Sequence, residues 1–423
     1  MSDETPKPKR RTSVHRPSSD ASRFHMSKEA VDRSVGDYFR MSDLECLKHL
    51  ARARWGSHKV VTCPHCSSSA EHYWSNTERR WKCKGCGKRF SVTSNTVFAN
   101  RRIPMQTLLA AIHVWVCGSA GQPALELRRI LGMKGYNTAF TLISKGREAL
   151  VRGYNTGLIS GVVEMDGAHI SGRGASQRRG KPLNYRNLDD EAAQADALLT
   201  TSARQKKRRE AKAAAIAAGG VVHPEHGNVF PAMRRITMNL RKRGGKKGKG
   251  TLTTRVGICM AETPQAAELL ARQFVAIPES ILATDTGTAF SKLGKEFQVH
   301  LQVNHSETLV GPDGQHVNNS ESFSARMDRA EKGIYLNIEP KYLNDYAVEV
   351  AFREDHNRLA PGEASDRFIH YALGVGLSRH FRGYTHGKHR DYEVLLTGNQ
   401  YAAPSGPAKG RSPISMANGR PPR

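Results

Sequence analysis

Short apolar runs that end in an aspartate stand out in the middle of the chain. In residues 161–172 (GVVEMDGAHISG), a β-prone run ends at Asp166 and glycines flank both ends. Residues 280–287 (SILATDTG) repeat the pattern with Asp285. A carboxylate at the end of a buried strand is costly unless a positive group meets it, and a divalent cation with oxygen ligands would serve. A turn aspartate that faces solvent is the alternative reading of residues 161–172.

Other segments around these two runs alternate between strand and helix patterns. The predicted strands are residues 252–260 and 299–304, and the predicted helices are residues 264–275 and a helix that begins at about Asn318. This alternation predicts an α/β domain.

The first third of the chain has the spacing of short helices instead. Residues 104–116 predict a buried helix, residues 123–131 a short helix that begins at a proline, and residues 137–152 a third helix. Residues 132–135 supply a glycine-bounded turn between the second and the third, which is the spacing of a helix-turn-helix. Thr138, Thr141, Ser144, Lys145 and Arg147 would then face a DNA groove. An ordinary pair of connected helices gives the same pattern.

Four of the seven cysteines form two CxxC pairs. Cys63 and Cys66 are followed after sixteen residues by Cys83 and Cys86, which is the spacing of a tetrahedral thiolate site for structural Zn²⁺. His65 and His72 lie nearby, but four cysteines complete the ligand set, so we expect both histidines to face solvent.

The charge of the chain indicates a polyanionic partner. Sixty-five Lys and Arg residues against 39 Asp and Glu give a formal charge of +26, and double-stranded DNA is the leading candidate. Basic residues interleave with aromatic ones around the second CxxC pair, as phosphate contact requires. They are Arg79, Arg80, Lys82, Lys84, Lys88 and Arg89. A zinc ribbon can equally bind protein. No run of about 18 apolar residues is present and no signal peptide is recognisable, so we expect a cytoplasmic protein without a membrane span.

Three segments are too polar to predict a packed fold. Residues 1–25 read as a disordered basic arm, and the tail from about Thr385 onward, rich in Gly, Pro and Ser, reads as disordered. Residues 173–250 read as an insertion whose basic runs, 204–212 and 234–249, would track DNA.

Glu321, on the helix that begins at about Asn318, completes a possible acidic triad with Asp166 and Asp285. Two strand-end aspartates and a glutamate on a helix can hold two Mg²⁺ or Mn²⁺ ions for phosphoryl transfer. Asn318, one turn before Glu321, is the alternative third ligand.

These motifs resemble one known family. They look like the motifs of ISXO-like insertion-sequence transposases, which are related to Merlin elements. The matching features are the zinc ribbon, the helix-turn-helix, VVEMDGAHISG, ILATDTGTAF, VNHS and HVNNSESFSARMDR. The resemblance covers about residues 44–360, except the basic insertion. The family implies a ribonuclease-H-like domain with an acid triad, carried here onto Asp166, Asp285 and Glu321, or Asn318. This chain departs from the family pattern at Ser324, where relatives have tryptophan. It also has Asp328 and Arg329 where relatives have a Lys-Arg pair, and Arg329 would contact DNA in place of the lysine.

The resemblance implies a domain order and an activity. We expect a basic arm (1–25), short helices with the ribbon (26–100), a helix-turn-helix (101–153), the catalytic domain (154–360) and a C-terminal extension (361–423). The activity would be cleavage and strand transfer at terminal inverted repeats by a homo-oligomer, in a bacterial cytoplasm and associated with the nucleoid. A DNA-binding regulator with an inactive domain and a structure-selective nuclease are the alternatives.

Overall fold

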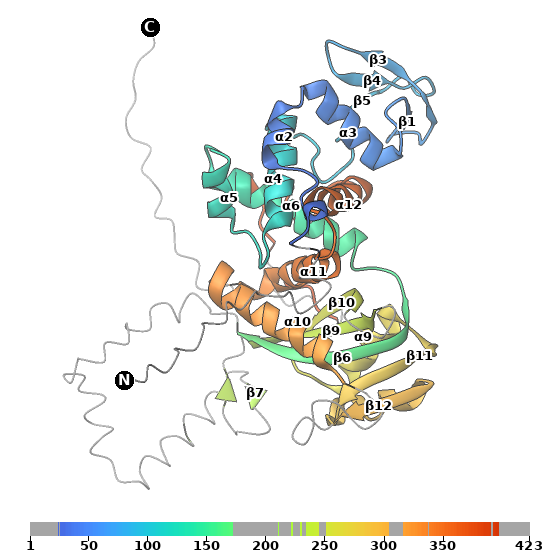
Figure 1. Cartoon of the computed structure of the whole chain (residues 1–423), viewed down its shortest axis with the longest axis vertical. Helices are drawn as coiled ribbons and strands as arrows, with labels where there is room; N and C mark the ends of the chain where they lie inside the picture. Colours follow the sequence, from blue (N-terminus) through green and yellow to red (C-terminus); the bar gives the residue numbers. More distant parts are fainter. Residues whose placement is uncertain are drawn as a thin grey trace, which may run out of the picture.

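The computed structural model describes residues 24, 26–171, 210, 221–222, 229–230, 234–244, 251–303, 316–336, 338–390 and 392–396 (Figure 1). The expected basic arm and most of the expected insertion lie outside the described residues. Figure 1 shows a β-rich ribbon at one end, a layer of helices in the middle and a sheet at the other end. Among the described residues, no helix has the length and apolarity that crossing a bilayer requires.

The ribbon packs on the first helices of the chain. These elements are η1 (Lys28–Ala30), α2 (Val35–Arg40), α3 (Asp43–Trp55), β1 (Val60–Thr62), β2 (Ser69–Glu71), β3 (Tyr73–Ser75), β4 (Arg80–Lys82) and β5 (Arg89–Phe90). Antiparallel pairing joins β1 to β2 and orders the other three strands β3-β4-β5. Trp81 on β4 is buried and stacks on Phe90 at 5.7 Å between ring centroids, so aromatic packing supplies the core of this small unit.

The middle layer is helical. It contains α4 (Met105–Cys117), α5 (Ala124–Ile130), α6 (Tyr136–Gly153), η5 (Ala330–Tyr335), α11 (Pro340–His356) and α12 (Pro361–Gly374). The three helices expected within residues 104–152 are present as α4, α5 and α6. Leu108 and Leu109 on α4 and Leu150 on α6 are fully buried in one apolar core that these helices share with α11 and α12.

The sheet has five strands in the order β10-β9-β6-β11-β12. Its elements and the helices and turns around it are β6 (Ile159–Ser171), β9 (Arg234–Arg243), β10 (Thr251–Cys259), α9 (Pro264–Phe274), β11 (Val275–Asp285), η3 (Thr288–Phe290), η4 (Leu293–Glu296), β12 (Val299–Val303) and α10 (Asn318–Arg329). Strands β9 and β10 are antiparallel to their neighbours, whereas β11 is parallel to both β6 and β12. The described chain also contains the short pair β7 (Val221–Val222) and β8 (Val229–Phe230) and the turn η6 (Tyr384–His386).

The two faces of the sheet differ in chemistry. Val163 and Met165 of β6 point into an apolar core with α9. Because side chains alternate along a strand, Glu164 and Asp166 point to the opposite face, which α10 and α11 cover. This second face also carries Asn239 of β9, which lies directly opposite Asp166.

Two segments expected to lack packed structure are part of the fold. Residues 234–243, expected to belong to a DNA-tracking loop, form β9 in the middle of the sheet, and the part of the tail up to Leu396 packs on the domain. In β9, Arg235 is buried in an ion pair with Glu393 of that tail, with two contacts of 2.7 Å, and Arg243 pairs with the buried Glu164. The sequence reading was wrong here because acids distant in the sequence neutralise these arginines.

Candidate catalytic and metal sites

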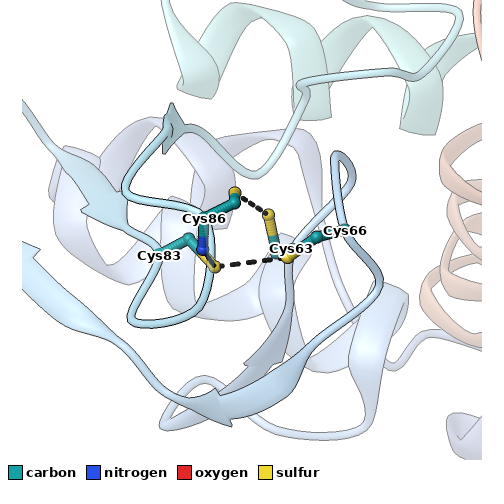
Figure 2. A group of neighbouring side chains, drawn as sticks. All are labelled: Cys63, Cys66, Cys83 and Cys86. Atoms are coloured by element: carbon teal, nitrogen blue, oxygen red, sulfur yellow. Dashed lines mark hydrogen bonds between the residues drawn. The ribbon is translucent and has the colours of Figure 1, made fainter.

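The four CxxC cysteines come together at one point of the ribbon. Figure 2 shows their sulfur atoms facing one another, and the four Sγ atoms lie within 4.8 Å of one another. The Sγ–Sγ distances are 3.8 Å for Cys63 and Cys86 and 3.5 Å for Cys66 and Cys83. A tetrahedral site with Zn–S bonds of about 2.3 Å requires sulfur separations of about 3.8 Å, so the cluster fits structural Zn²⁺.

Backbone N–H groups favour the thiolate form of Cys83. Gly85 and Cys86 donate to Cys83 Sγ at 3.3 and 3.5 Å, and these contacts lower the pKa of Cys83 to about 6. His65 is exposed as expected, but the expectation that His72 faces solvent was wrong. The buried His72 ring accepts a hydrogen bond from the Lys84 N–H at Nδ1 and lies 3.1 Å from the Ser68 carbonyl at Nε2, so it joins the two knuckles.

Asp166 is partly buried on β6, on the face that α10 covers. The expectation that it ends the strand was wrong, because β6 continues to Ser171 in its pairing with β9. Its Oδ2 accepts a hydrogen bond of 3.1 Å from the Ser324 hydroxyl of α10. Burial raises the pKa of Asp166 to about 6, and the charges of Asp285 and Glu321 add to that shift. Asp285 and Glu321 therefore both lie within electrostatic reach of Asp166, and a cation between these acids would offset the cost of their charges.

Asp285 ends β11 beside Asp166. The parallel register pairs Ala283 with Glu164, so Asp285 lies two residues on, level with Asp166 on the neighbouring strand. The Gly287 N–H donates to Asp285 Oδ1 at 2.9 Å, which fixes one oxygen and leaves the other available to a cation.

Glu321 and its alternative Asn318 both lie in the first turn of α10, and both are exposed. Ser324 follows Glu321 by three residues, so the two share the helix face that meets Asp166. Glu321 influences the charge state of Asp166 directly. This electrostatic contact favours Glu321, and the roles of all these residues remain predictions. Among the described residues, the four cysteines are the only group of three or more potential metal ligands whose ligand atoms all lie within 4.8 Å of one another.

The sequence reading missed a fourth acid, Glu262. It lies between β10 and α9, and its carboxylate would be 3.1 Å from a Cβ added at Gly167, so the glycine lets it approach closely. Burial raises the pKa of Glu262 to about 7, with contributions from Asp166 and Asp285. The sequence pattern that indicated the two aspartates could also have indicated Glu262, because Glu262 follows an apolar strand.

A second missed residue, Glu164, fixes the start of α10. It is fully buried on β6, and its Oε2 accepts hydrogen bonds from the backbone N–H groups of Asn319 and Ser320 at 3.0 and 3.2 Å. Its Oε1 accepts from Arg243 at 2.8 Å and from the Asn319 side chain at 2.7 Å. Glu164 therefore holds the helix that carries Glu321 at a fixed place over Asp166.

The predicted DNA-binding residues divide into two groups. Arg147, expected in a DNA groove, is buried and forms an ion pair of 2.5 Å with Glu349 of α11, and Ser144 is buried as well. That expectation was wrong because the face of α6 that carries both residues packs into the helical layer. Lys145 instead lines a cavity. The remaining candidates are all exposed: Arg79, Arg80, Lys82, Lys84, Lys88, Arg89 and Arg329.

Two family models match the stretches of the chain that carry these two candidate sites. Residues 158–355, which include Asp166, Asp285 and Glu321, match the family model described as the ISXO2-like transposase domain. Residues 41–89, which include all four clustered cysteines, match the transposase zinc-ribbon domain. The chain belongs to the ISXO2-like transposase family. Searches of curated proteins and of solved structures gave no significant match. This transposase thus combines an α/β transposase domain with an N-terminal zinc ribbon, as the sequence motifs indicated.

Proposed function

We propose that this transposase cuts DNA at the ends of its element and joins the freed ends to target DNA, with Asp166, Asp285 and Glu321 as its catalytic acids. The observation that carries this proposal is the position of the two aspartates. Asp285 ends β11, and Asp166 lies level with it on the parallel neighbour β6, on one face of the sheet and under the helix that bears Glu321. Carboxylates in this arrangement suit two divalent cations.

We infer that the catalytic domain is ribonuclease-H-like. The strand order supports this inference: the first three strands of the sheet, β6, β9 and β10, are antiparallel neighbours, and the next two, β11 and β12, add in parallel on the other side of the first. The acids then lie within the first strand, at the carboxyl end of the fourth and on a helix that follows the fifth.

Mg²⁺ or Mn²⁺, when bound, would activate the attacking oxygen and stabilise the leaving oxygen of an in-line displacement. The protein's own groups orient the ligands: Ser324 holds Asp166 Oδ2, and the Gly287 N–H holds Asp285 Oδ1. In the first displacement water attacks the phosphodiester at the element end and releases a 3′-hydroxyl. In the second, that 3′-hydroxyl attacks a target phosphodiester and displaces a target 3′-oxygen.

We also propose that the zinc ribbon and the helices α5 and α6 bind the terminal repeats, as a helix-turn-helix would. Exposed basic residues of the ribbon, among them Arg80, Lys82 and Lys88, support this role. Since two ends must be brought together, the working form would be a dimer or a larger homo-oligomer.

Cutting and joining of labelled element ends tests the catalytic proposal. In Mg²⁺ or Mn²⁺ the wild type should yield nicked and joined products, and Asp166→Asn should abolish them. Asp328→Asn is the matched control, because Asp328 lies on α10 in an exposed pair with Lys332. Equal activity of Asp166→Asn and the control would refute the assignment. Cutting without joining would point to a nuclease, and tight binding without cutting to a regulator.

The third ligand is decided by two further variants in the same assay. Glu321→Gln should remove activity, whereas Asn318→Ala should retain it. The reverse result would assign the role to Asn318.

A further inference from the structure

A groove runs between the zinc ribbon and the helical layer. It consists of two adjoining cavities of about 800 and 700 Å³, which share the lining residues Ala99, Asn100, Arg101 and Leu377. The first cavity borders the ribbon, and the second is lined by α6 and by the segment after α12. No strand of the five-stranded sheet lines either cavity, so the groove is separate from the candidate catalytic site.

The second cavity is strongly positive. Its lining includes Arg101, Arg102, Lys145, Arg382 and His386 and no acidic residue. Within the part of the chain that the structure describes, Arg102, Lys145 and Arg382 have no carboxylate within ion-pair distance. The first cavity differs, because its Arg79 and Arg89 pair with Asp43 and Glu78. The excess positive charge is therefore concentrated where α6 meets the C-terminal segment.

Polar atoms in the second cavity lack partners. Arg101 Nε and Thr141 Oγ1 are buried atoms without a hydrogen-bond partner among the described residues. Burial also lowers the pKa of Lys145. Buried donors of this kind normally have acceptors, so this wall has the donors that an anion would satisfy.

The floor of the second cavity is apolar but offers no stacking surface. Phe98 and Phe381 line it, yet only 3% and 2% of their surfaces are exposed. Single strands bind by stacking bases on accessible aromatic rings, whereas duplex binding relies on cations that meet phosphates. The groove therefore fits the backbone of a duplex better than unpaired bases.

We propose that this groove binds the sugar-phosphate backbone of double-stranded DNA next to the ribbon, with Arg102, Lys145 and Arg382 as its phosphate contacts. The proposal deepens the end-binding function proposed above and rests on it. It also gives the C-terminal segment a role, because Arg382 comes from the region after α12 and completes a wall that α6 and residues 96–103 begin.

The test is a binding titration of the full chain against a fluorescent duplex of a candidate element end, repeated over a range of KCl concentrations without added Mg²⁺ or Mn²⁺. The double variant Lys145→Gln/Arg382→Gln should weaken binding about tenfold or more and lower the slope of log K against log salt by about two. The control Lys295→Gln/Arg358→Gln removes the same charge from exposed residues outside the groove and should bind within about twofold of wild type. Melting curves of both double variants verify folding.

Equal affinity and slope for the groove variant and the control would overturn the proposal. The same titration is repeated with one strand of that duplex alone. If the groove variant loses affinity only for this single strand, the assignment to duplex DNA is wrong. The titration is independent of cleavage, and Asp166→Asn should bind as the wild type does. If DNA binding depends on the groove residues but the wild type does not cut DNA, only the catalytic proposal is refuted. If the wild type cuts DNA and the groove variant binds and cuts equally well, only this inference is refuted.

Discussion

At the residue scale, the Asp166 carboxyl group is costly to ionise. Its pKa of about 6 in the folded chain lies above the ordinary value of 3.8, because burial and the charges of Asp285 and Glu321 disfavour the anion. A raised carboxyl pKa means that the folded state favours the protonated form. The contribution of Asp166 to the free energy of unfolding is therefore most favourable below about pH 4. This contribution falls as the pH rises through 6, by an amount on the order of 3 kcal/mol at most.

This cost predicts a pH-dependent effect of metal. Without divalent cations, Asp166→Asn should raise the melting temperature at pH 8 and change it little at pH 4. Mn²⁺ should stabilise the wild type at pH 8, stabilise it much less at pH 5 where protons compete, and leave Asp166→Asn nearly unaffected. Differential scanning fluorimetry measures all of these shifts, with Asp328→Asn as the control. Equal Mn²⁺ stabilisation of Asp166→Asn and the wild type would contradict the prediction.

The sequence predicted the placement of some candidate site residues and not of others for a physical reason. Asp166 and Asp285 were predictable because a carboxylate after an apolar run is a local pattern, and the parallel pairing of β6 with β11 brings the two residues level. Arg147 was misplaced because its partner, Glu349, lies 202 residues away, and a local pattern cannot show which face of α6 packs. Glu262 was overlooked although its pattern resembles that of the aspartates, since its proximity to Asp166 depends on Gly167.

At the element scale, α10 depends on a carboxylate from a different element. Glu164 of β6 accepts hydrogen bonds from the first N–H groups of α10, where a negative charge also favours the helix dipole. It also balances Arg243 of β9. Glu164 thus acts as a positioning residue, since it connects the strand of Asp166 to the helix of Glu321.

Glu164→Gln should therefore weaken both the fold and the site. Both Glu164 oxygens accept hydrogen bonds, so an amide would turn one acceptor into a donor that faces other donors. We expect a loss of about 3–5 kcal/mol in urea unfolding, against less than about 1 kcal/mol for Glu363→Gln, whose partner Arg367 is exposed. Below its melting temperature, Glu164→Gln should also need more Mn²⁺ for half-maximal cleavage. An unchanged Mn²⁺ requirement would limit Glu164 to a structural role.

The ribbon is an element whose core is too small to be stable without metal. Trp81 packs between Trp55 and Trp74, with ring-centroid distances of 5.5 and 4.8 Å, so tryptophan emission reports on this core. Cys63→Ser should lower zinc content, shift that emission to longer wavelength and weaken duplex binding, because structural zinc supplies folding energy. Cys117→Ser, an exposed cysteine on α4, should change none of these. Retained emission and affinity after zinc loss would contradict the prediction.

At the scale of the whole molecule, charges far apart in sequence decide the fold of the sheet. The run in residues 234–249 holds eight basic residues and no acid, which reads locally as a solvated loop. Three acids from other parts of the chain pair with arginines of β9: Glu164 with Arg243, Glu354 with Arg241, and Glu393 with Arg235. No local pattern reveals such pairing, whereas the ribbon was predictable because its cysteines are local.

Of the three acids that pair with β9, Glu393 lies farthest from its arginine in the sequence, so its removal is the strictest test of stabilisation by distant charges. It comes from the C-terminal segment, is 3% exposed and forms a two-pronged contact with Arg235, 158 residues away. Glu393→Gln would leave a buried guanidinium without its counter-charge, and we expect a loss of about 3–5 kcal/mol in urea unfolding. Glu279→Gln removes the same charge from an exposed position on β11 and should cost less than about 0.5 kcal/mol. If the two variants unfold alike, the segment does not stabilise the sheet through Arg235. If only Glu393→Gln is destabilised, the C-terminal segment stabilises the sheet domain through Arg235.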